Sequence, residues 1–170
     1  SPGASYLTKK APTQLFADII KNILYKAHAL GIDISFCFLG NKADQKDVEK
    51  IIPMLPKECL WENVSGKLDL LSTANKIADL SCVLGNDSSI GHIAEAQQVA
   101  AFVLFGPTVE TFGFAPQLMQ SRAYSVSLGC RPCSKHGSTP CRYEDKLCFT
   151  QINAEKVATD ILSFLQSLRN

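Results

Sequence analysis

Small polar side chains crowd between two apolar runs near the middle of the chain, in the stretch LGNDSSIGHIAEAQQVAAFVLFGPT. We predict that Asp87 or Ser88 caps a helix that follows. The first amides of such a helix lack internal partners and the helix dipole is positive there, which favours an anion such as a phosphate. Small residues at Ser88 and Ser89 let a ligand approach the backbone, and His92 could donate to a phosphate oxygen. An ordinary helix cap with a packed histidine is the alternative.

Two other segments carry groups that suit the same ligand. The opening stretch SPGASYLTKKAP is rich in Gly and Ser, precedes a helical pattern and carries Lys9. A lysine ammonium there could neutralise a diphosphate as a mobile point charge. Gly106-Pro107-Thr108 is a tight turn after a strand, and Thr108 could hydrogen-bond a ligand. Solvated surface lysines and a simple turn are the alternatives for these two segments.

The cysteines fall into two groups. Four of the seven lie in a Cys-rich loop at residues 129–150, namely Cys130, Cys133, Cys141 and Cys148. Four thiolates could hold a structural zinc ion or an iron–sulfur cluster, but the spacing departs from common zinc ribbons, so disulfides or free thiols are the alternatives. The other three lie in or beside apolar runs, as buried thiols do: Cys37, Cys59 and Cys82. An odd total with buried thiols favours a reducing compartment.

The elements that must position these residues alternate between helix and strand. Amphipathic helical periods are found at 12–30, 44–52, 68–78, 89–97 and from Asn153 onward. Apolar strand-like runs lie at 32–39, 59–61, 80–84, 101–105 and 124–128. This alternation predicts an α/β fold, a doubly wound parallel sheet with helices on both faces, in a single domain.

Three helices have a core face that the pattern specifies. On the helix at 12–30 we expect one stripe made of Leu15, Phe16, Ile19, Ile20, Ile23, Leu24 and Ala27. On the helix at 68–78 we expect an inward face made of Leu70, Leu71, Ala74, Ile77 and Ala78. On the closing helix, capped by Asn153, we expect an inward face made of Val157, Ile161, Phe164, Leu165 and Leu168.

Ligands of open parallel sheets bind outside the carboxyl ends of the strands. The loops that we predict at this edge are residues 1–10, 40–43, 62–67, 85–92 and 106–114. They bring Lys9, His92 and Thr108 to one side of the sheet, so a phosphate-containing ligand is the hypothesis that unites them.

Composition excludes other classes of function. The 170 residues carry a net charge of +1, which gives no support to a nucleic-acid surface or a polybasic membrane patch. No apolar run reaches the roughly 18 residues that a transmembrane helix needs. The opening Ser1-Pro2-Gly3 does not resemble a secretory leader, and without an initiator Met we expect a piece of a longer protein.

The motifs PGAS…TKKAP, NDSSIGHIAEA and VLFGPT resemble, in order and spacing, those of glycosyltransferase family 9, the ADP-heptose:lipopolysaccharide heptosyltransferases. The C-x2-C…C…C tail is similar to that of many members, and the resemblance spans nearly the whole chain. It implies a two-domain GT-B enzyme in which residues 1–170 form the C-terminal, Rossmann-like nucleotide-sugar-binding domain. The implied reaction is inverting transfer of heptose from ADP-heptose to a lipopolysaccharide inner-core acceptor, which binds through the other domain.

The same resemblance implies roles for individual residues. Lys9 would face the donor diphosphate, Leu68 would cover the adenine, and Thr108 belongs to the family's G-P-T/S turn. The diphosphate and sugar contacts would come from Asp87, Ser88 and His92, with Ser89 beside them. The general base would be an Asp of the N-terminal domain, so no catalytic residue is expected in this fragment, which alone would be inactive. No cofactor or divalent metal is required if side chains stabilise the leaving group.

Three positions depart from the family pattern. Ser89 stands for the usual Gly, Ala11 for a common Trp, and Lys42 for a Glu that holds donor hydroxyls in some members. Because of these departures, the resemblance does not determine the identity of the donor sugar. They also support an alternative function, a non-catalytic nucleotide-binding or interaction domain that has kept the fold. The enzyme interpretation implies a cytoplasmic protein, peripheral at the inner face of the inner membrane, with no nucleic-acid partner.

Overall fold

Helices and strands alternate along residues 1–169, which are the residues that the computed structural model describes. The strands are β1 (Ser35–Phe38), β2 (Leu60–Asn63), β3 (Cys82–Asn86), β4 (Ala100–Leu104) and β5 (Arg122–Tyr124). The helices are α1 (Thr13–Ala29), α2 (Gln45–Ile51), α3 (Leu70–Ala78), α4 (Ser89–Ala96), α5 (Leu147–Thr150) and α6 (Ala154–Ser167). Each element expected from the hydrophobic pattern is present, although several boundaries are shifted, β5 most clearly.

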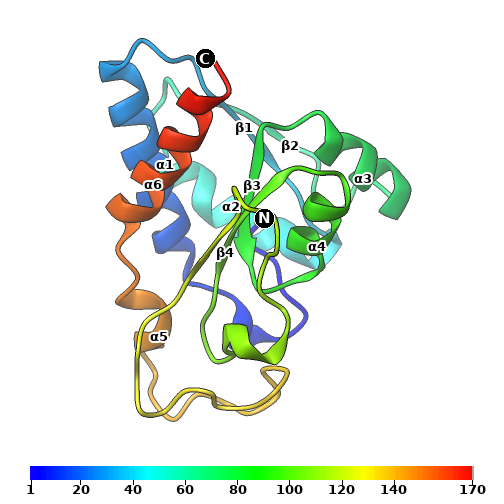
Figure 1. Ribbon diagram of the computed structural model, residues 1–170, viewed down its shortest axis with the longest axis vertical. Coiled ribbons are helices and arrows are strands. Elements are labelled where there is room, and N and C mark those ends of the chain that lie inside the picture. The colour runs from blue at the N-terminus through cyan, green and yellow to red at the C-terminus, as the bar shows by residue number, and fades with distance from the viewer. Residues whose placement is uncertain (170) are drawn as a thin grey trace.

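The strands form two parallel sheets. One has the order β1-β2 and the other the order β3-β4-β5, and every pairing within the described residues is parallel. Helices α1 and α6 lie together on one side of the strands, and α3 and α4 lie on the other (Figure 1). Parallel strands between two helical layers confirm the predicted doubly wound α/β fold.

Strand β4 is the centre of the core, because its side chains are buried on both faces. Ala100, Phe102 and Leu104 pack into the apolar cluster that includes α1 and α6. The alternate residues Ala101 and Val103 pack into a second cluster with α3 and α4. A continuous apolar run is the expected sequence of a parallel strand that is covered on both faces.

The two long helices follow the predicted pattern closely. The predicted core face of α1 is buried at Leu15, Phe16, Ile19, Ile20, Ile23 and Ala27, and its remaining member, Leu24, is half-buried against the same cluster. Asn153 caps α6 by accepting a hydrogen bond from the amide of Lys156 at 2.9 Å. Phe164 of α6 packs its ring 5.9 Å from that of Phe102. The prediction was wrong for Leu168, which is 57% exposed because it lies beyond the last turn that faces α1.

The predicted core face of α3 is mostly wrong. Ile77 is fully buried, but Leu70 and Leu71 are 73% and 71% exposed, and Ala78 is also exposed. The first turn of α3 projects beyond the rest of its layer (Figure 1), so that no element of residues 1–169 covers it. An apolar stripe is buried only where another element packs against it.

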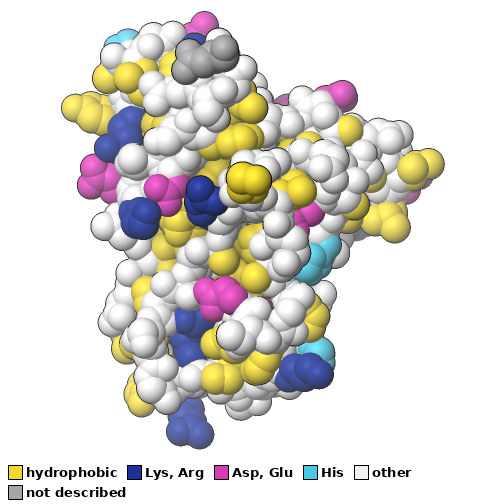
Figure 2. Space-filling view, viewed as in Figure 1, with side chains coloured by type: hydrophobic (Ala, Val, Ile, Leu, Met, Phe, Trp, Pro, Cys, Tyr) yellow, Lys and Arg dark blue, Asp and Glu magenta, His cyan; other side chains and the backbone are white. Residues whose placement is uncertain are grey.

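The surface carries charges of both signs. Basic and acidic side chains are mixed over the face seen in Figure 2, and hydrophobic side chains lie exposed among them. Within residues 1–169, no helix combines the length and the apolar character that crossing a bilayer requires.

We expect Gly106→Ala to destabilise the chain. A Cβ atom at Gly106 would lie 2.2 Å from two ring carbons of Phe149, which is fully buried. Overpacking of this kind costs about 2 kcal/mol, so the midpoint of urea denaturation should fall. Gly129→Ala is the matched control, because a Cβ there meets nothing within 4 Å. Equal midpoints for the two variants would show that Phe149 moves aside freely.

Candidate functional site

Three side chains from separate loops meet at the carboxyl edge of the sheet. The Lys9 Nζ lies 2.7 Å from Asp87 Oδ2, and the Thr108 hydroxyl donates to the same oxygen at 2.7 Å. The Asp87 side chain is 4% exposed and that of Lys9 is 14% exposed. The structure therefore brings together three of the residues that the sequence singled out, as one buried ionic cluster.

Parallel pairing explains why these loops meet. Asn86 pairs with Leu104 at the ends of β3 and β4. Beyond that pair, the amide of Asp87 donates to the carbonyl of Leu104 at 3.1 Å. The loop that begins α4 and the turn that contains Thr108 thus leave the sheet side by side.

Asn86 fastens the opening loop to the end of β3. Its side chain is fully buried and accepts a hydrogen bond from the amide of Ala11 at 3.0 Å. Its amide group donates to the carbonyls of Pro2 at 2.8 Å and of Gly3 at 3.4 Å. The sequence placed Asn86 in the polar stretch but suggested no role for it, since such long-range bonds leave no local signal.

Lys10 fixes the other end of the opening loop. Its ammonium lies 2.8 Å from a carboxylate oxygen of Asp44 and 2.8 Å from one of Asp47. Asp44 is buried and also accepts from the amide of Asn41 at 3.0 Å. Burial alone would lower the pKa of Lys10, but the hydrogen bonds to both carboxylates outweigh it and hold the pKa above its usual value. Sequence reasoning missed this pair, since it considered the lysines of the opening loop either as partners of a diphosphate or as solvated.

The amino end of α4 has no side-chain cap. Ser88 occupies the N-cap position in an extended conformation, as predicted, but its side chain makes no capping hydrogen bond. The Ser88 hydroxyl oxygen is buried and has no partner among the described residues. The Asp87 carboxylate bonds to Lys9 and Thr108 through Oδ2 and makes no capping bond to α4 among the described residues. The first amides of α4 and the Ser88 hydroxyl are therefore free to bind a ligand.

The space beside this helix end is narrow. A cavity of about 10 Å³ is lined by residues that include Asp87, Ser88, His92 and Phe114. This volume holds roughly one water molecule and excludes a diphosphate. A larger anion would have to lie on the outer side of the cavity, where the exposed His92 is accessible, or displace the segment around Phe114.

Phe114 borders the cluster and was not predicted from the sequence. Its ring centroid lies 6.0 Å from the Lys9 ammonium and 5.9 Å from the ring of His136. A cation above an aromatic face is attracted by the ring quadrupole, so Phe114 helps to hold Lys9 in place. Its position in a long irregular loop gave no signal beyond the general tendency of such loops to be functional.

The Cys-rich loop is attached to the same edge of the sheet. The amide of Cys133 donates to the carbonyl of Pro107 at 2.9 Å, and Arg131 donates to the carbonyl of Thr108 at 2.7 Å. Lys146 donates to the carbonyls of Leu7 at 2.8 Å and of Lys10 at 3.0 Å. The loop at 129–150 therefore supports both the opening loop and the turn that contains Thr108.

The four clustered cysteines are not gathered around a common point in the part of the chain that the structure describes. No three Cys, His or carboxylate side chains there lie close enough to hold an ion together. All seven cysteines are free thiols. Burial raises the pKa of Cys148 to about 11 and also raises that of Cys133, which disfavours the thiolate that a metal needs. Metal binding by Cys130, Cys133, Cys141 and Cys148 stays a prediction.

The other predicted positions lie apart from the ionic cluster. Leu68 packs in the second apolar cluster, just before the residue that caps α3. Ser89 is exposed at the first position of α4. Of the departures from the family pattern, Lys42 is exposed and Ala11 is buried. The contact that the resemblance implies for Leu68 stays a prediction.

Comparisons with known proteins agree with one another. Residues 1–145 match the model of glycosyltransferase family 9 (heptosyltransferase). Lipooligosaccharide heptosyltransferase 2 of Campylobacter jejuni is 25% identical over 163 residues, covering 95% of this chain and 49% of that protein. The chain spans about half the length of the curated relatives that it matches from end to end.

Solved structures share the fold. E. coli ADP-heptose LPS heptosyltransferase II superposes with a TM-score of 0.78 at 20% identity, covering 99% of this chain and 46% of that one. The iron-containing heptosyltransferase TibC, a dodecamer solved in complex with ADP-D-beta-D-heptose, gives a TM-score of 0.67 at 17% identity, with coverages of 98% and 44%. At these identities the likeness shows the fold alone.

Proposed function

The chain belongs to glycosyltransferase family 9, and we therefore propose that residues 1–170 are the C-terminal, donor-binding domain of a longer two-domain GT-B enzyme. The reaction that we propose is inverting transfer of heptose from ADP-heptose to an inner-core acceptor of lipopolysaccharide. Relatives that act as heptosyltransferases support the sugar and the acceptor. The nucleotide-sugar bound to TibC supports the donor.

One observation carries the proposal for the donor site. The Lys9 ammonium bonds to Asp87, which precedes the amino end of α4. Among the described residues this helix end has no side-chain cap, and the buried Ser88 hydroxyl there has no partner. Lysine has three N–H donors, so Lys9 can keep its bond to Asp87 and still donate to a phosphate oxygen. Uncapped amides and a positive helix end favour the same anion.

The proposed mechanism depends on the negative charge that develops on the leaving group. An acceptor hydroxyl attacks the anomeric carbon through an oxocarbenium-like state as the nucleoside diphosphate leaves. Lys9, His92 and the α4 amides would stabilise the negative charge of the leaving group without help from a metal ion. The general base would be an Asp of the N-terminal domain, so the activity belongs to the two-domain protein.

The proposed partners are a nucleotide-sugar and a lipopolysaccharide acceptor, and no nucleic acid. Because lipopolysaccharide acceptors are held in membranes, we propose a cytoplasmic enzyme that works peripherally at the inner face of the inner membrane.

Calorimetry with ADP tests the donor site. We expect weak binding to the 170-residue chain, and Lys9→Ala should lower the affinity roughly tenfold or more because a charged hydrogen bond is lost. His92→Ala should weaken binding to a smaller extent. Lys21→Ala, on the exposed face of α1, is the control and should bind as the wild type does.

A non-catalytic domain that has kept the fold is the second candidate function. The narrow cavity beside His92 and the pairing of Lys9 with Asp87 favour it. If neither Lys9→Ala nor His92→Ala changes the affinity for ADP, the proposed donor site is wrong and this second function remains.

A further inference from the structure

The segment of residues 113–118 closes the narrow cavity at the amino end of α4. Phe114 and Pro116 of this segment line the cavity together with Ser88 and His92. The volume left between them is about 10 Å³, which holds roughly one water molecule. Because the Ser88 hydroxyl is buried, a ligand as large as a phosphate reaches it only after a wall of this cavity has moved.

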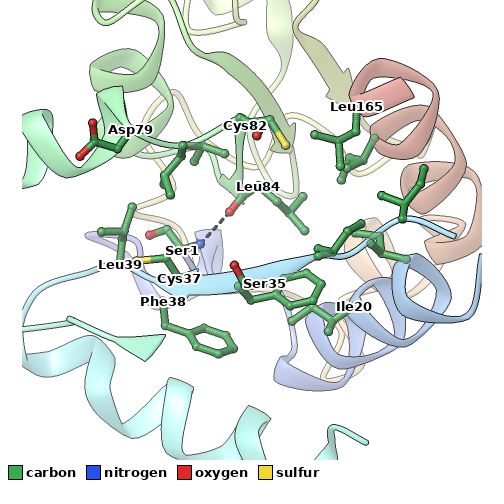
Figure 3. Close-up of a pocket in the computed structure, with 18 of the residues that line it drawn as sticks. Ser1, Ile20, Ser35, Cys37, Phe38, Leu39, Asp79, Cys82, Leu84 and Leu165 are labelled. Carbon is green, nitrogen blue, oxygen red and sulfur yellow. Dashed lines mark hydrogen bonds between the residues drawn. The ribbon is translucent and has the colours of Figure 1, made fainter. Parts of the chain in front are cut away.

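A larger cavity offers no second route to this helix end. It has a volume of about 410 Å³ and lies between β1 and β3, with Cys37 and Leu84 at its walls (Figure 3). Its lining contains no residue of the ionic cluster and neither Ser88 nor His92. Access to the amino end of α4 therefore depends on the small cavity and on the segment that closes it.

One side chain of α4 holds the segment in place. The Glu95 carboxylate accepts a hydrogen bond from the amide of Gln117, at 2.8 Å to each oxygen, and another from the amide of Leu118 at 2.8 Å. Within residues 1–169, these are the hydrogen bonds that join residues 114–118 to a helix or strand. Bonds to an ionised acceptor are stronger than bonds to a neutral one. Glu95 therefore latches the segment to the helix whose end it covers.

The two ends of the segment differ in a way that suits a hinged movement. Gly113 has a left-handed backbone conformation with a φ of 87°, and no described atom lies within 4 Å of the position that a Cβ would take. Such a glycine can absorb a change of backbone dihedrals. At the other end, the buried Ser121 hydroxyl accepts from the amide of Ala101 in β4 at 2.9 Å. The segment thus runs from an unobstructed glycine to a serine that is fixed to the sheet.

Movement of the segment would change the surroundings of Lys9. The Lys9 ammonium lies 6.0 Å from the centroid of the Phe114 ring, whose quadrupole attracts it. Asp87 holds the same ammonium at 2.7 Å. When the segment swings away, Phe114 leaves, and a phosphate oxygen can take its place beside Lys9.

We propose that residues 113–118 form a lid over the amino end of α4, and that Glu95 is the positioning residue that keeps this lid closed. The ligand that the lid admits is the diphosphate of a nucleotide, so the inference rests on the proposed function. Only molecules with an open lid can bind, and the apparent affinity is reduced by their fraction. Breaking the Glu95 latch therefore raises the affinity, which the loss of a merely structural contact would not do.

Thiol labelling tests the lid without any nucleotide. Ser88→Cys places a thiol at the buried position, and Ser89→Cys, at the exposed position beside it, is the control. Iodoacetamide should label the Ser88→Cys thiol about tenfold faster once Glu95→Ala is added, because the lid is open more often. The Ser89→Cys thiol should react at one rate in both backgrounds, as followed by mass spectrometry. Equal rates for Ser88→Cys with and without Glu95→Ala would overturn the lid.

Calorimetry with ADP tests whether the lid controls the site. Glu95→Ala should bind ADP about tenfold more tightly than the wild type, and Glu95→Gln, which keeps one acceptor oxygen, should lie between them. Glu49→Ala removes an exposed carboxylate of α2 and, as the control, should bind as the wild type does. The gain should persist in about 0.5 M NaCl, where the repulsion of an anion by a nearby charge is screened. A gain that disappears in salt would contradict the latch, as would unchanged or weaker binding by Glu95→Ala.

The two measurements separate this inference from the proposed function. If none of the proteins binds ADP, the donor site is wrong, and the labelling rates alone decide whether Glu95 latches a lid. If the wild type binds ADP but the labelling rates are equal, the donor site stands and the lid is wrong. Glu95→Gln takes the place of Glu95→Ala in both measurements if the alanine variant does not fold.

Discussion

Replacing Asn86 by Ala is expected to lower the free energy of unfolding by about 3 kcal/mol, because buried groups would lose their hydrogen-bond partner. The Ala11 amide and the Pro2 carbonyl both bond to this side chain, which is fully buried. Truncation leaves them unsatisfied away from water. Urea denaturation followed by circular dichroism measures the loss as a lower midpoint with an unchanged slope.

Asn75→Ala is the control for this variant. Asn75 lies exposed on α3, so its replacement should change the stability by less than about 0.5 kcal/mol. If Asn86→Ala unfolds at the same urea concentration as Asn75→Ala, the opening loop is not held by Asn86. Since that loop carries Lys9, a true loss of the anchor should also weaken any binding of ADP.

The second large effect is expected at Lys10. Lys10→Met keeps most of the apolar stem but leaves Asp44 buried without its cation, which should cost about 3 kcal/mol. The double variant Lys10→Met/Asp44→Asn should recover part of this loss, because a neutral amide is less costly to bury than an unpaired carboxylate. Thermal and urea denaturation of the three proteins measure it. A double variant no more stable than Lys10→Met would contradict the ion pair as the cause.

The same pair gives a pH dependence with a defined sign. The pKa of Lys10 is raised in the folded chain, so its contribution to stability is fully present below the unfolded pKa, near 10.5. That contribution is lost as the pH rises through the higher folded value. The stability difference between wild type and Lys10→Met should therefore be constant near neutrality and shrink above about pH 10.5. If the stability difference between the two proteins grows as the pH rises, the sign assigned to the Lys10 contribution is wrong.

The fold could be predicted because the hydrophobic periodicity of the helices and strands was clear, as were the Gly and Pro residues that end them. The stripe of α1 and the cap of α6 at Asn153 depend on neighbours in sequence, and both are found. The exposed start of α3 could not be predicted in this way. Leu70 and Leu71 fit an inward face by spacing, yet burial depends on whether another element reaches them, which no local pattern encodes.

For the candidate site, the sequence predicted only which loops lie at the carboxyl edge of the sheet. Strand ends of a parallel sheet meet, so Lys9, Asp87 and Thr108 were expected on one side, and the structure places them in contact. Their pairing with one another was not foreseen. Which cation meets which carboxylate is decided by loop closure over long sequence separations, as it is for Lys10 and Asp44.

The attachment of the Cys-rich loop has a consequence for the order of folding. Lys146 bonds to Leu7 across 139 positions, and Thr8 bonds to Gly137 across 129. Contacts of such high contact order form late, because closing so long a segment costs chain entropy before any contact repays it. Strands β3 and β4 and the helix α4 between them are close in sequence and can therefore assemble before Lys9 reaches its final environment, so a ribosome-bound chain that still lacks residues 121–170 would expose an unfinished site.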